Sequence, residues 1–132
     1  MAKAVEKAVN AILKADAPIA TVVGTRIHHD HLPQNQTLPA LTYGLVDDVR
    51  PITHDTQIGP GRARIQVTAH AADFPTARDL AEKVADLDGT TGTFAAIIVQ
   101  LMRYETMVKF YSDDPVVKEY FIPVDFFVHY GT

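Results

Sequence analysis

The chain has 132 residues, of which 47% are hydrophobic and 21% are charged, a composition typical of an ordinary globular protein. Its 12 basic and 16 acidic residues give a formal net charge of −4, which argues against non-specific binding to nucleic acid phosphates. The absence of cysteine excludes disulfides, thiolate zinc sites and cysteine nucleophiles. We expect one domain over residues 1–132 and no membrane-spanning segment, because the longest apolar run is only Phe94–Val99.

Two amphipathic helices are predicted. Apolar residues at steps of three and four indicate the first helix, over residues 2–15; they are Val5, Ala8, Val9, Ile12 and Leu13. Pro18 ends it, and a short turn or helical stub follows as far as Val23. The second helix has Asp73 as its N-cap, Pro75 in its first turn and Gly89 at the expected stop. Its buried stripe comprises Ala77, Leu80, Ala81, Val84 and Leu87.

Four strands account for most of the remaining pattern. They cover Leu41–Val49, Arg64–Ala71, Ala96–Lys109 and Glu119–Tyr130, and a short strand also fits Arg26–His28. Pro123 cannot donate to a sheet ladder, which favours an edge position or a bulge for the last strand. The order of elements predicts an α+β fold, with an antiparallel sheet of about four strands and two helices packed on one face.

Arginines flank a loop rich in proline and glycine, about Arg50–Gly61. Arg50, Arg62 and Arg64 can meet at the base of this loop and recognise an acidic surface or a phosphate. An equally good explanation of these arginines is that they are ordinary surface charges, which keep the ends of the strands soluble. The loop matches neither a dinucleotide fingerprint nor a P-loop.

The segment His28-His29-Asp30-His31 is the one cluster of metal-ligating residue types. Imidazole and carboxylate bind zinc, and His54 or His70 would complete a site. Adjacent side chains rarely point at one centre, however, so a polar loop explains the segment better. The pairs Asp47-Asp48 and Asp113-Asp114 lie at strand ends, where aspartate serves turns. We therefore assign no catalytic, cofactor-binding or metal-binding residue.

Phe121 and Phe127 fall on the face of the last strand that alternation assigns to solvent. Two large aromatic side chains on one sheet face indicate that something covers them. We expect the helices to pack on the opposite, apolar face of this strand. A partner surface is therefore favoured, and these two residues join the three arginines as expected interface residues.

Several segments, taken in order, resemble the tail-completion proteins of long-tailed bacteriophages, also called tail terminators or tail-to-head joining proteins. After an amphipathic helix come Gly24–Ile27, Leu32–Gln34 and Leu38–Thr42, then the strand Arg64–Ala71, an alanine-rich helix and an aromatic strand. The resemblance implies a virion component that caps the tail tube as a ring of six and joins the tail to the head or neck. It also implies a protein made in the host bacterial cytoplasm, with no enzymatic activity and no cofactor.

Further implied partners are the major tail tube protein and a head–tail connector or neck protein, at the head-proximal end of the tail. DNA would pass through the ring without specific binding. Two alternatives stay open at this stage. One is a small metal-dependent enzyme that uses His28–His31, and the other is a dimeric α+β module that binds a small ligand.

Overall fold

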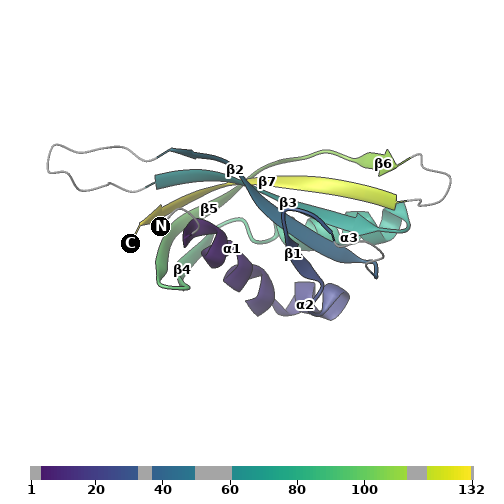
Figure 1. Ribbon diagram of the computed structural model, residues 1–132, viewed down its shortest axis with the longest axis horizontal. Coiled ribbons are helices and arrows are strands. Elements are labelled where there is room, and N and C mark those ends of the chain that lie inside the picture. Colours follow the sequence, from purple (N-terminus) through teal and green to yellow (C-terminus); the bar gives the residue numbers. More distant parts are fainter. Residues whose placement is uncertain (1–3, 33–36, 50–60, 113–118, 132) are drawn as a thin grey trace, which may run out of the picture.

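The computed structural model describes residues 4–32, 37–49, 61–112 and 119–131. Within these ranges the chain forms three helices and seven strands, in the order α1 (Ala4–Ala15), α2 (Ala17–Val23), β1 (Ile27–His29), β2 (Ala40–Val49), β3 (Gly61–Ala71), α3 (Phe74–Ala85), β4 (Thr90–Phe94), β5 (Ile97–Met107), β6 (Phe110–Ser112) and β7 (Glu119–Gly131) (Figure 1). None of the helices in these ranges is long and apolar enough to cross a membrane.

The helices begin where side chains satisfy their first backbone N–H groups. Asp16 accepts a hydrogen bond of 3.2 Å from the Ile19 N–H, so the segment that ends α1 also caps α2. Asp73 accepts one of 3.3 Å from the Thr76 N–H, which confirms the predicted N-cap of α3. α3 ends at Ala85, earlier than predicted, and Gly89 (φ +88°) lies in the turn that leads to β4.

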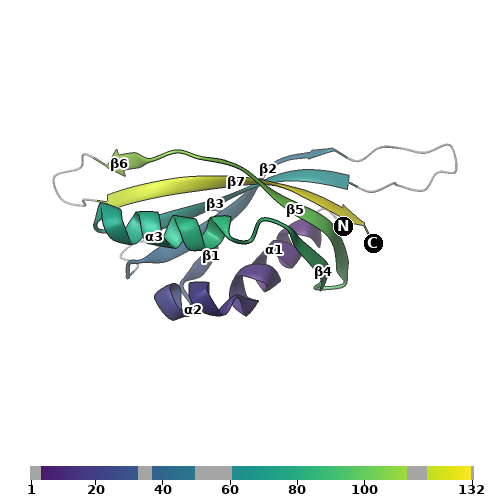
Figure 2. The same ribbon diagram turned by 180° about the vertical axis from the view of Figure 1, so that it is seen from behind.

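The strands of the described ranges form one sheet in the order β1–β2–β3–β7–β5–β4, and β6 pairs with β7. β1 runs parallel to β2, whereas every other pair is antiparallel. Both views show α1, α2 and α3 on the same side of this sheet (Figures 1 and 2). The α+β class and the single helix-covered face are thus confirmed. The predicted numbers, about four strands and two helices, are too low.

The missed elements are short or exposed. β4 is exposed along most of its length, so it lacks the alternation that marks a half-buried strand. β6 has three residues, too few for any periodicity. β1 is equally short, but it was predicted as the short strand Arg26–His28 and is found at Ile27–His29. α2 is a complete helix of seven residues rather than a stub, because the Asp16 cap and Pro18 in its first turn favour helix at this point.

The core lies between the helices and one face of the sheet. Alternate residues of β3 and β7 form its floor: Ala63, Ile65, Val67 and Ala69 from β3, and Ile122, Val124, Phe126 and Val128 from β7. The predicted apolar stripes of α1 and α3 are buried against this floor. The strands were therefore assigned the correct inward face, and their other face is left to polar and aromatic side chains.

The sequence favoured an edge position or a bulge for Pro123, and the edge position is wrong. β7 is central, with β3 on one side and β5 and β6 on the other. On the second side, pairing to β5 stops at Val124 and pairing to β6 begins at Phe121. Pro123 therefore lies at the break between β5 and β6, where its carbonyl accepts from the Val108 N–H at 3.2 Å. A central strand tolerates proline here because the neighbouring strand is interrupted.

We expect Gly61→Ala to lower the free energy of unfolding by roughly 1–3 kcal/mol. A Cβ atom at Gly61 would lie 2.6 Å from Cζ of Tyr130, its partner in β7. The Tyr130 ring is buried, and its hydroxyl donates to Oδ1 of Asp48 at 2.7 Å, so it has little freedom to move. Urea denaturation measures the loss. Gly131→Ala is the matched control, because its nearest neighbour would lie 3.7 Å away. An equal cost for both variants would contradict this packing.

Candidate functional site

The face of the sheet opposite the helices, called the open face below, carries two rows of polar and aromatic side chains. β3 contributes Arg62, Arg64, Gln66, Thr68 and His70, and β7 contributes Phe121, Pro123, Asp125, Phe127 and His129. All three described helices pack on the other side, so Phe121 and Phe127 owe their partial burial to neighbours on the open face.

Phe127 lies beneath two arginines. The guanidinium carbon of Arg62 is 4.9 Å from the centre of the Phe127 ring, and that of Arg64 is 5.8 Å away. Both distances fall within the range of cation–π attraction. Phe121 lies farther along β7 and stacks on the His70 ring at 6.2 Å. The structure therefore unites three of the five predicted interface residues, sets Phe121 apart, and leaves Arg50 outside the described residues.

Asp125 is a charged centre of the open face that sequence reasoning did not identify. The residue is 7% exposed, and its carboxylate accepts from Nη2 of Arg64 at 2.6 Å and from Nε2 of Gln66 at 3.0 Å. The hydrogen bond to Asp125 and its negative charge raise the pKa of Arg64 above its ordinary value. Only the register of β3 against β7 brings these residues together, since they are far apart in sequence.

His70 links three strands at the other end of the open face. Its Nδ1 pairs with Oε1 of Glu119 in β7, and its Nε2 lies 3.0 Å from Oγ1 of Thr42 in β2. These contacts use both ring nitrogens within the protein. His70 is thus held as a structural connector, and Thr42, which it contacts, pairs in turn with His28 of β1.

The histidine segment does not converge on one point. His29 pairs with Glu6 of α1 through a 2.6 Å contact between Nε2 and Oε2. Asp30 adopts a left-handed conformation (φ +68°) and its N–H donates to the Tyr43 carbonyl, while His31 is exposed. Among the residues described, no three His, Asp or Glu side chains come close enough to share a metal ion. His54 lies outside these residues.

The carboxylate pairs are likewise separated. Asp48 accepts from the Tyr130 hydroxyl, whereas Asp47 is exposed beside Arg64 on the open face. Asp113 and Asp114 lie outside the described residues.

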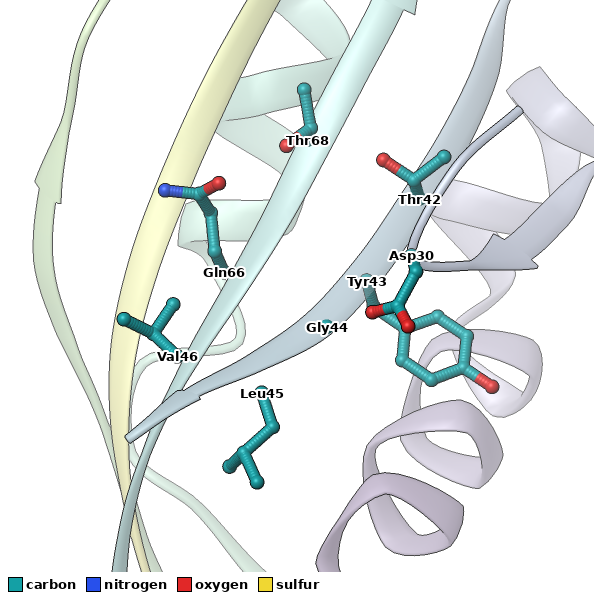
Figure 3. Close-up of a pocket in the computed structure, with 8 residues that line it drawn as sticks. All are labelled: Asp30, Thr42, Tyr43, Gly44, Leu45, Val46, Gln66 and Thr68. Carbon is teal, nitrogen blue, oxygen red and sulfur yellow. The ribbon is translucent and has the colours of Figure 1, made fainter. Parts of the chain in front are cut away.

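Two shallow pockets in the described part of the chain lie along the open face. One of about 160 Å³ is lined by Asp30 and by residues of β2 and β3, including Thr42, Tyr43 and Gln66 (Figure 3). Burial raises the pKa of Tyr43, and the negative charges of Glu6 and Asp30 raise it further. The second pocket, about 220 Å³, lies over Phe127; its other lining residues are Arg62, Arg103, Tyr104, Glu105 and His129. Both are open surfaces rather than enclosed ligand cavities of the usual size.

The sequence model of the family described as tail completion protein gp17 matches residues 7–120, most of the chain. The chain belongs to this tail completion family. Membership supports a structural role in the tail of a bacteriophage-type virion.

Solved structures agree with the family assignment at the level of the fold. A chain from "Virion of native gene transfer agent (GTA) particle" is similar to this tail completion protein with a TM-score of 0.70 and 20% sequence identity. The similarity covers 98% of this chain and 96% of that chain. A search of curated proteins finds no match.

Proposed function

We propose that this tail completion protein caps the tail tube as a ring of six copies and joins the tail to the head or neck. The family match over residues 7–120 is the observation that carries the proposal. The chain would act as one domain over residues 1–132, at the head-proximal end of the tail and without catalysis. Its partners would be the tail tube protein and a connector or neck protein.

The surface of the protein suits such a role. A closed ring needs two different patches on each subunit, and a cap also needs a face for the tube. The aromatic and arginine residues of the open face (Arg62, Arg64, Phe121 and Phe127) are the proposed contacts to another copy or to the tube, and Arg50, outside the described residues, is proposed with them. Six chains of net charge −4 give a ring charge of −24, which favours passage of DNA without specific binding.

The test combines mass measurement with electron microscopy of purified protein, alone and with tail tube protein. Six chains of 14.5 kDa predict a species of 87 kDa and annular particles. When both proteins are present, tubes should carry a cap at one end and stop growing. A protein that stays at 14.5 kDa and leaves the length distribution of the tubes unchanged would contradict the proposal.

A further inference from the structure

Exposed apolar side chains gather at two places in the structure. Every large hydrophobic residue that is exposed in the described ranges lies on β2, on β5 or just after β5. They are Leu45, Val46 and Val49 on β2, Ile98 and Tyr104 on β5, and Val108. Single exposed apolar residues are normal on a protein surface, whereas grouped ones indicate a contact surface. This distribution therefore marks two surfaces that something covers.

Except for Ile98, which pairs with β4 on one side and β7 on the other, these residues lie on or just beyond strand edges that the described strands leave partly unpaired. β1 pairs with Leu41–Tyr43 of β2, so the outer edge of β2 has no strand beside it from Gly44 to Val49 within the described residues. β4 pairs with β5 from Ile97 to Met102, so in the same ranges the outer edge of β5 is without a strand from residue 103 to residue 107. Such edges are templates for pairing with another chain.

The two edges lie level with each other across the sheet. One row runs Asp47–Arg64–Phe127–Arg103, and the next runs Leu45–Ile65–Phe126–Tyr104. Three successive antiparallel pairings also make β5 antiparallel to β2. If copies are related by rotation about an axis along the strands, the β5 edge of one copy therefore meets the β2 edge of the next in antiparallel orientation and without an offset.

Charge complements this arrangement. Asp47 and Arg103 are both exposed, and in the described part of the chain neither side chain forms a hydrogen bond or ion pair, although the negative charge of Asp47 helps to raise the pKa of nearby Arg64. Arg64, which neighbours Asp47, is already paired with Asp125. The level arrangement places Asp47 of one copy opposite Arg103 of the next, and the half-exposed side chains of Leu45 and Tyr104 opposite each other.

We infer that the β2 edge of one copy docks beside the β5 edge of a second copy, with Asp47 against Arg103 and Leu45 against Tyr104. This inference rests on the proposed ring and names its subunit contact. The contact joins two different patches and leaves no offset along the axis, so it repeats until a ring closes. The Tyr104 N–H, which now donates to Oδ1 of Asp88 at 2.8 Å, would face the neighbouring strand. Between its two edges, the open face stays free of this contact.

Disulfide cross-linking tests the contact directly, because the chain has no cysteine of its own. In the variant Leu45→Cys/Tyr104→Cys, the two thiols of adjacent copies would lie within the Cα separation that a disulfide requires, about 4.4–6.8 Å. Oxidation should give a ladder of covalent species that ends at six chains. Leu45→Cys/Ile98→Cys is the matched control, because Ile98 is also exposed on β5 but lies farther along the strand, opposite Gly131. It should give no ladder.

The outcomes separate this inference from the proposed function. A particle of 87 kDa in which the thiols introduced at positions 45 and 104 form no cross-link would overturn the edge contact and leave the ring intact. A monomer without cross-links would overturn both. If the two edges become protected from hydrogen exchange only when tube protein is added, the tube covers them. That result would also overturn the contact between copies.

Charge reversal provides an independent readout on the same contact. Asp47→Arg and Arg103→Asp each place like charges opposite one another at every subunit boundary, so each should shift the mass from 87 kDa to 14.5 kDa. The double variant restores opposite charges and should restore the larger particle. Loss of assembly in the double variant as well, with an unchanged fold by circular dichroism, would overturn the pairing.

Discussion

Phe126→Ala is expected to lower the free energy of unfolding by about 3–5 kcal/mol, because it opens a cavity in the centre of the core. Phe126 is 0% exposed and lies on the face of β7 that the helices cover. Tyr104 packs edge-on against it, with 6.2 Å between the ring centres. Chemical denaturation followed by circular dichroism measures the loss.

The neighbouring residue provides the control. Phe127 lies on the open face, where its ring is half-buried under arginines, so Phe127→Ala should cost only about 1 kcal/mol of stability. Its main effect should be on assembly with the tube or with other copies. A shift of one residue in the register of β7 would exchange the two faces. Equal losses of stability for the two variants would therefore contradict the observed register.

Elements with strong local patterns could be predicted from the sequence. The apolar stripe of α1, the Asp73 cap of α3 and the alternation in β3 are each set by neighbours a few residues away. The same alternation assigned Phe121 and Phe127 to the face away from the helices. These predictions required no knowledge of which strands pair.

The pairing of strands could not be predicted, because it depends on contacts between residues far apart in the chain. The sequence associated Arg62 and Arg64 with a loop, and treated Phe127 as a separate feature. The register of β3 against β7 instead places Arg64 directly opposite Phe127. The link between His29 and Glu6 is of the same kind, since it joins β1 to a helix that precedes it by many residues.

The number of strands was underestimated for a different reason. β4 holds threonine and glycine in an exposed position, and its assignment rests on its hydrogen bonds to β5 rather than on any burial of its own. Its presence leaves only part of the β5 edge unpaired, which restricts the edge available to a partner to the segment that begins at Arg103. The missed strand thus bears directly on the proposed contact.

Substitutions in the ion pair of Arg64 with Asp125 on the open face should have the second large effect on the free energy of unfolding. The Asp125 carboxylate is nearly buried, and its charge is balanced by the Arg64 guanidinium at 2.6 Å. A buried carboxylate that loses its cation is strongly destabilised, because its charge stays buried without a counter-charge. An arginine that loses its carboxylate is less affected here, since more than a third of the Arg64 side chain is exposed to solvent.

Arg64→Met should therefore cause the largest loss of stability among single substitutions of polar residues on the open face, and Asp125→Asn a clearly smaller one. Gln66→Met removes only the 3.0 Å hydrogen bond to Asp125 and should cost least. The double variant Arg64→Met/Asp125→Leu removes both charges, so it should recover most of the stability that Arg64→Met loses. Urea denaturation of the four variants measures this order. If Arg64→Met and the double variant are equally unstable, the loss comes from packing around residue 64 rather than from the isolated charge of Asp125.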